Sequence, residues 1–215
     1  MKAVLFDLDG TLLDTLRDIA DACNAALGRH GFPPHPVDSY RYFVGDGVPV
    51  LVSRTVPAQQ QTGETLASVA AAYREEYQHR WNATTTLYPG IAELLDQLTC
   101  RGVRMAVLSN KPDDFTRRCV AEFLSRWNFS TVLGASKAFP PKPDPAGARH
   151  IAAALNLPCD QFCYLGDTPT DMRTAVAAGM FSVGVLWGFR NAEELKAAGA
   201  RQLISHPREL LELEL

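Results

Sequence analysis

The chain has 215 residues, of which 47% are hydrophobic and 21% charged, and this balance excludes a disordered or fibrous protein. A formal net charge of −3 without any block of like charges gives no reason to expect a nucleic acid as partner. No apolar run reaches the ~20 residues of a membrane-spanning helix, and the five cysteines contain no C-x-x-C pair. We therefore expect a cytoplasmic protein with no membrane partner.

The first predicted element is a buried strand over the apolar run 3–6, which is followed directly by D-L-D-G-T at 7–11. Side chains two residues apart on an extended chain point the same way, so Asp7 and Asp9 are expected to share one small volume. Two carboxylates so placed repel each other unless a cation lies between them. The pattern suggests a divalent metal, a nucleophile beside an acid/base, or both. Solvated acids in an Asp-Gly turn are the simpler alternative.

Residues 14–83 show helical spacing of apolar residues and no strand pattern. Asp14-Thr15 is expected to cap the first helix of this segment. The G-D-G sequence at 45–47 predicts either a plain turn or a loop that faces a substrate. Residues 10–14 and 84–86 are the expected hinges on either side of the segment. The predicted helices cover residues 16–27, 37–43, 48–54 and 65–81.

From residue 84 onward, strand patterns alternate with helix patterns, which predicts a parallel sheet covered on both faces. The expected fold is therefore α/β, with a Rossmann-like core of residues 1–13 and 84–215 and an inserted all-helical domain of residues 14–83. The predicted strands of the second core segment cover 103–108, 130–134, 162–165, 181–186 and 202–204. The predicted helices between them cover 89–98, 115–127, 144–155 and 171–178.

Ligands of open parallel sheets bind at the carboxyl ends of the strands, so polar residues just after each strand are candidates for one site. Lys142, which lies among prolines rather than directly after a strand, joins them as a nearby cation. A carboxylate can attack phosphorus, and a second acid can protonate the leaving oxygen. A hydroxyl, backbone amides and a lysine can hold the phosphoryl oxygens, and Mg²⁺ can screen the charge. The candidates are Asp7, Asp9, Ser109, Asn110, Lys142, Asp167 and Asp171.

Four segments in this order, D-L-D-G-T at 7–11, Ser109-Asn110, K-P-D-P at 142–145 and G-D-T-P-T-D at 166–171, resemble the motifs of the haloacid dehalogenase superfamily of aspartyl-phosphate phosphatases. The helical insert resembles the C1 cap of that superfamily. The cap segment F-V-G-D-G at 43–47 and S-N-K-P at 109–112 are similar to its phosphoglycolate phosphatase-like branch. Within the fourth motif, Pro169 is compatible with a helix start that Thr168 caps.

The resemblance implies a role for each matching residue. Asp7 would be the nucleophile and a metal ligand, and Asp9 the general acid/base, with its backbone carbonyl also on the metal. Asp167 would be a further metal ligand, and Asp171 would orient a metal-bound water or Lys142. The residues implied to bind the substrate are Thr11, Ser109, Asn110 and Lys142 in the core and Gly45, Asp46 and Gly47 in the cap loop.

The resemblance also implies a magnesium-dependent phosphatase, acting as monomer or homodimer on a small phosphate monoester, with 2-phosphoglycolate as the preferred substrate. Three alternatives stay open: a phosphomutase of the β-phosphoglucomutase type, a phosphatase for a sugar phosphate, nucleotide or pyrophosphate, and a non-catalytic binding module. The presence of Asp7 and Asp9 disfavours the last, and Asp9 also argues against a dehalogenase. A phosphonate hydrolase would need a cap lysine, and 14–83 contains none. Lys111 is predicted either to be solvated or to contact the substrate.

Overall fold

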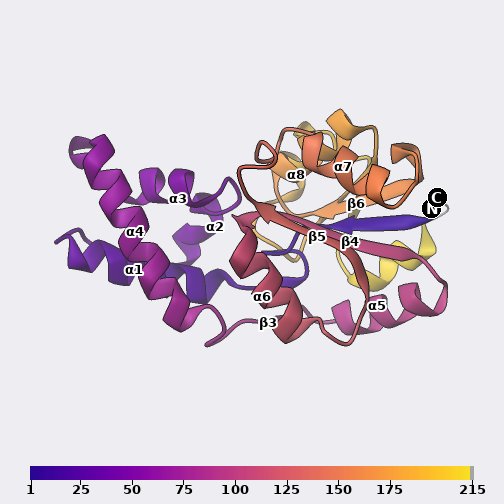
Figure 1. Cartoon of the computed structure of the whole chain (residues 1–215), viewed down its shortest axis with the longest axis horizontal. Coiled ribbons are helices and arrows are strands. Elements are labelled where there is room, and N and C mark those ends of the chain that lie inside the picture. Colours follow the sequence, from indigo (N-terminus) through magenta and orange to yellow (C-terminus); the bar gives the residue numbers. More distant parts are fainter. Residues whose placement is uncertain (214–215) are drawn as a thin grey trace. The chain divides into compact units, whose positions relative to one another are not determined.

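The computed structural model describes residues 1–213, and the chain divides into two compact units (Figure 1). The core unit comprises Met1–Asp14 and Leu87–Leu215, and the inserted unit comprises Thr15–Thr86. Among the described residues, no helix is long and apolar enough to cross a membrane. Two-residue strands, β2 (Leu13–Asp14) and β3 (Thr86–Leu87), pair where the chain passes from one unit to the other.

The core unit contains a six-stranded sheet in the order β5-β4-β1-β6-β7-β8, in which every neighbouring pair is parallel. Strand β1 lies centrally, with Ala3 aligned to Arg104 of β4 and to Phe162 of β6. The expected parallel α/β core is confirmed. Its strands are β1 (Ala3–Phe6), β4 (Arg104–Pro112), β5 (Phe129–Ala135), β6 (Phe162–Gly166), β7 (Phe181–Val185) and β8 (Gln202–Ile204).

Helices cover both faces of this sheet, as the continuous apolar runs of its central strands require. Figure 1 shows α7 and α8 on one face and α5 and α6 on the other. Leu5, Leu108 and Tyr164 form one buried cluster with Ile151 of α7 and Ala175 of α8. The helices of the core are α5 (Ile91–Cys100), α6 (Asp113–Phe123), α7 (Ala146–Ala154), α8 (Pro169–Ala178) and α9 (Ala192–Ala197), with 3₁₀ turns at Cys159–Gln161 and Pro207–Glu212.

Two predicted boundaries in the core differ from the observed ones by four residues, the other boundaries by at most two, and α9 has no counterpart among the predicted helices. Strand β4 does not end before Ser109 but continues to Pro112, with a shift in its pairing to β5 between Leu108 and Pro112. Helix α6 ends at Phe123 instead of residue 127, although apolar residues continue beyond it. Leu124, which follows α6, has ψ 12° and is fully buried, so the apolar spacing beyond the helix reflects packing of a turn.

The described residues of the inserted unit form helices joined by turns and irregular segments, and the four predicted helices are confirmed. The prediction that Asp14-Thr15 caps the first helix is wrong, because the Thr15 side chain makes no capping hydrogen bond. Asp18 of α1 instead accepts hydrogen bonds from the backbone N–H and the hydroxyl of both Thr84 and Thr85, at 2.6–3.1 Å. The helices are α1 (Leu16–Arg29), α2 (Tyr40–Phe43), α3 (Val48–Thr55) and α4 (Gly63–Arg80), with 3₁₀ turns at Val37–Ser39 and Ala58–Gln60.

Candidate active site

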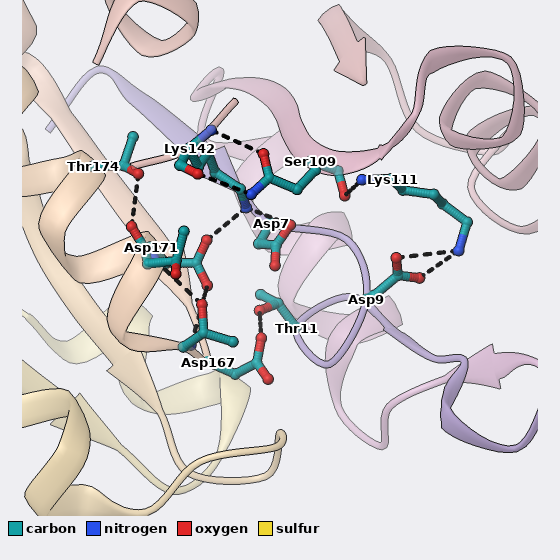
Figure 2. Close-up of polar contacts among 12 residues, drawn as sticks. Asp7, Asp9, Thr11, Ser109, Lys111, Lys142, Asp167, Asp171 and Thr174 are labelled. Atoms are coloured by element: carbon teal, nitrogen blue, oxygen red, sulfur yellow. Dashed lines mark hydrogen bonds and ion pairs between the residues drawn. The ribbon is translucent and has the colours of Figure 1, made fainter. Parts of the chain in front are cut away.

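The carboxyl end of the core sheet gathers the core residues that the sequence singles out (Figure 2). Asp7 and Asp9 follow β1, and Asp167 follows β6. Ser109 and Asn110 lie within the last residues of β4. All of these side chains are buried, together with Lys142, Asp171 and Thr11. A buried group of charged and hydroxyl side chains at this edge of a parallel sheet is a candidate active site.

Lys142 lies between two carboxylates. Its Nζ is 2.8 Å from Oδ1 of Asp7 and 2.6 Å from Oδ1 of Asp171. The Lys142 ammonium is thus the cation that pairs with this buried Asp7 oxygen. Buried carboxylates are costly unless positive charge or donors surround them, and one lysine is shared here between two of them.

Asn110 fixes the segment that carries Lys142. Its Nδ2 donates to the Lys142 carbonyl oxygen at 3.1 Å, and its Oδ1 accepts from the Lys142 N–H at 2.9 Å. The sequence points to the backbone amide of Asn110 as a phosphoryl-binding group but gives no sign of this task for its side chain. The side chain holds a lysine that comes 32 residues later in the chain.

Burial and like charges shift the pKa values of the acidic residues. Burial, followed by the negative charge of Asp171, raises the pKa of Asp7 from 3.8 to about 7, although Lys142 opposes the change. Burial and the charges of Asp171 and Asp7 also raise the pKa of Asp167 well above its ordinary value. Burial alone would lower the pKa of Lys142, but Asp171 and Asp7 raise it well above 10.5. The negative charge of these carboxylates therefore exceeds the positive charge that Lys142 supplies.

Three side chains can bring oxygen atoms to one point, since Asp7, Asp167 and Asp171 each offer a carboxylate oxygen within 4.8 Å of the others. Each Asp171 oxygen already accepts two hydrogen bonds, Oδ1 from Lys142 and Tyr164, and Oδ2 from the N–H and the hydroxyl of Thr168. Each Asp167 oxygen accepts only one, so Asp7 and Asp167 are better placed as direct ligands. Carboxylate oxygens in excess of positive charge fit Mg²⁺.

A close-fitting cradle holds Asp167. The Thr11 hydroxyl donates to Asp167 Oδ1 at 3.0 Å, and the Phe189 N–H donates to Oδ2 at 2.8 Å. A Cβ atom at Gly10 or Gly188 would collide with the Asp167 side chain, and Gly10 also has a φ of +87°. Thr11, expected to bind the substrate, thus places its hydroxyl hydrogen on this carboxylate.

The fourth motif also forms a helix start. Thr168 caps α8 by accepting from the Asp171 N–H, and the Asp171 side chain accepts in return from the Thr168 N–H at 3.1 Å. The expected cap of Thr168 before Pro169 is confirmed. Asp171 therefore serves both the helix N-terminus and the ion pair with Lys142.

Asp9 lies close enough to Asp7 for its negative charge to contribute to the raised pKa of Asp7. Both residues follow the end of β1 at Phe6. The Asp9 carboxylate faces Lys111, whose Nζ is 2.8 Å from Oδ1 and 3.1 Å from Oδ2 (Figure 2). Lys111 is 7% exposed, so the prediction of a solvated lysine is wrong.

The loop at 45–47 belongs to the inserted unit. Gly45 and Gly47 have φ angles of 121° and 86°, so the backbone alone requires glycine at both positions. Between them, Asp46 pairs with Arg54 of α3 at 2.7 Å, and Arg54 Nη1 also donates to the Phe43 carbonyl at 3.2 Å. The sequence interpretation missed Arg54, whose only signal is a cation placed eight residues after Asp46.

The sequence profile of haloacid dehalogenase-like hydrolases matches residues 4–185, which include every motif of the core site. The chain belongs to this family. Within it, the chain is similar to the phosphoglycolate phosphatase of Cereibacter sphaeroides, with 36% identity over 99% of this chain and 97% of that protein. The phosphoglycolate phosphatase of Psychrobacter arcticus is 31% identical over 91% of this chain and 87% of that protein.

The likeness extends to the fold. The crystal structure of a predicted phosphoglycolate phosphatase from Haemophilus somnus has a TM-score of 0.91 to this chain at 26% identity, and covers 99% of this chain and 97% of the other. This haloacid dehalogenase-like hydrolase therefore falls in the phosphoglycolate phosphatase-like branch.

Proposed function

We propose that this haloacid dehalogenase-like hydrolase is a magnesium-dependent phosphatase that cleaves a small phosphate monoester through an aspartyl-phosphate. The observation that carries the proposal is the buried Asp7 carboxylate directly after β1, whose Oδ1 lies 2.8 Å from the Lys142 ammonium. Such a carboxylate can attack phosphorus, while Lys142 offsets the negative charge that gathers there.

In the first step, an Asp7 oxygen forms a bond to phosphorus as the bond from phosphorus to the ester oxygen breaks. Asp9 gives its proton to that ester oxygen, which leaves as an alcohol. In the second step, Asp9 takes a proton from water, the water oxygen bonds to phosphorus, and the bond to Asp7 breaks. Phosphate is released, and both aspartates return to their starting states.

Several groups would hold the phosphoryl oxygens during these steps. The Ser109 hydroxyl oxygen accepts from the Lys111 N–H at 3.2 Å, which directs the hydroxyl hydrogen elsewhere, toward a phosphoryl oxygen. Lys142 supplies a positive charge held by Asp171, and the Asn110 backbone amide is a further donor. The side chains of Asp7 and Asp167 and the backbone carbonyl of Asp9 would hold Mg²⁺. When bound, the ion neutralises charge on the phosphoryl group and the nucleophile.

The proposed substrate is 2-phosphoglycolate, because the relatives from C. sphaeroides and P. arcticus carry that activity in their names and align with almost the whole chain. A phosphomutase of the β-phosphoglucomutase type would use the same aspartates but exclude water from the phospho-enzyme. A sugar phosphate, nucleotide or pyrophosphate would require a different fit to the leaving group.

The test is the release of inorganic phosphate from a panel of phosphate esters by the purified protein with Mg²⁺, with and without excess chelator. We expect 2-phosphoglycolate to give the highest kcat/KM and chelator to abolish turnover. A phospho-enzyme that persists until a sugar phosphate is added would favour the mutase. Release that is unchanged by Asp7→Asn would refute the proposed nucleophile.

A further inference from the structure

We propose that Lys111 exchanges partners during the reaction: it pairs with Asp9 before substrate binds, and with a second negative group of the substrate afterward. The inference rests on the proposed function and narrows the substrate class to phosphate monoesters that carry another anionic group close to the ester oxygen. In 2-phosphoglycolate this group is the carboxylate, which is bonded directly to the carbon that bears the ester oxygen.

The resting arrangement is a buried ion pair. Both Asp9 oxygens lie within 3.1 Å of Lys111 Nζ, and the two side chains are 11% and 4% exposed. Figure 2 shows the Lys111 side chain extending from β4 to meet Asp9 on the side away from Asp171. The pair thus occupies both oxygens of the group that is proposed to protonate the leaving alcohol.

For proton transfer, Asp9 must first take up a proton, from water or from the substrate's phosphate group, and bring the protonated oxygen within hydrogen-bond reach of the ester oxygen. That movement breaks at least one of the two contacts with Lys111. A buried ammonium group that loses its contact with a carboxylate is less stable unless another anion replaces that contact. A substrate carboxylate supplies this replacement, whereas a neutral substrate does not.

The position of Lys111 places this anion contact beside the phosphoryl site. Lys111 lies two residues after Ser109, and its N–H donates to the Ser109 hydroxyl oxygen at 3.2 Å. The residue that is proposed to hold the phosphoryl group and the residue that is proposed to receive the second anion are therefore fixed to each other. This spacing suits an anion separated from phosphorus by only a few bonds.

The test compares 2-phosphoglycolate with its neutral amide, 2-phosphoglycolamide, which keeps the phosphate and the carbon chain. For the wild-type enzyme we expect kcat/KM to be about 10- to 100-fold higher for the anionic substrate, the range for a hydrogen bond between charged groups. Lys111→Met should lower kcat/KM for 2-phosphoglycolate about 10- to 100-fold more than for the amide, because only the carboxylate loses its cation.

Lys196→Met is the matched control, since Lys196 is an exposed lysine of α9 and its loss should leave both substrates unchanged. If Lys111 only positioned Asp9, Lys111→Met would lower kcat for both substrates by the same factor, and the inference would be overturned. Equal kcat/KM values for the two substrates in the wild-type enzyme would overturn it even if the variant failed to fold. Hydrolysis that Asp7→Asn abolishes supports the proposed function in either case, and no hydrolysis of any ester by the wild type would overturn both.

Discussion

The side chain of Asn110 forms two hydrogen bonds with the backbone of Lys142, one in each direction, at 3.1 and 2.9 Å. These two hydrogen bonds fix the backbone of the loop that carries Lys142. The position of the Lys142 ammonium between Asp7 and Asp171 therefore depends on a residue of β4.

Asn110→Asp should lower kcat by about 10- to 100-fold, the effect of misplacing a catalytic group by roughly 1 Å. The aspartate keeps the acceptor for the Lys142 N–H but loses the donor to its carbonyl oxygen. Steady-state hydrolysis of p-nitrophenyl phosphate measures the change, and circular dichroism checks the fold. A kcat within twofold of wild type would show that the Lys142 loop holds its position without Asn110.

Asp7→Asn should reduce turnover by more than about 1,000-fold, because the amide has nearly the same shape but cannot act as the attacking carboxylate. The same change removes a charge that burial and Asp171 disfavour. We therefore expect the metal-free variant at pH 8 to melt about 3 °C above wild type, the effect of about 1 kcal/mol in a chain of this size. Differential scanning calorimetry in chelator tests this, and a lower melting temperature would contradict the proposed electrostatic strain.

The stabilisation by Mg²⁺ should grow with pH. The pKa of Asp7 is about 7 in the folded, metal-free chain against 3.8 for the ordinary group, and Asp167 shifts in the same direction. Stability from a raised carboxyl pKa is present below about pH 4 and is lost as the pH rises through the folded value. Because Mg²⁺ favours the ionised carboxylates, the melting-temperature increase with Mg²⁺ should be several-fold larger at pH 8 than at pH 5.5. An equal increase at both values would exclude these aspartates as the metal ligands.

Arg54→Met should alter substrate preference more than chemistry. The change removes the ion pair with Asp46 and the hydrogen bond to the Phe43 carbonyl, and so releases the 45–47 loop from α3. We expect kcat/KM for the best natural substrate to fall about tenfold more than for p-nitrophenyl phosphate, since about 1.4 kcal/mol of leaving-group contact is lost. Arg74→Met, on α4, serves as the control because Arg74 lies outside the loop and α3. Parallel losses for both substrates would make the loop a structural turn.

Sequence patterns predict the core because its central strands are continuous apolar runs and three of its four motifs lie at the ends of such strands, whereas K-P-D-P at 142–145 lies in a loop. The pairing of Asp9 with Lys111 could not be predicted, since it joins residues 102 positions apart and depends on the chain leaving the extended conformation after Phe6. The hydrogen bonds from Asn110 to Lys142 could not be predicted from the sequence for the same reason. They depend on the path of a loop, and no spacing of residues encodes that path.

Asp18 binds Thr84 and Thr85 through four groups, all within the inserted unit, and so ties its first helix to the last residues of its chain. The first helix and the last residues of the insert are thus held together by a buried carboxylate that belongs to the insert itself. Because these bonds do not involve the helices between the two ends, we expect changes in those helices to leave the first helix of the insert bound to its last residues. A single aspartate would thus allow the insert to change while the core keeps its catalytic residues.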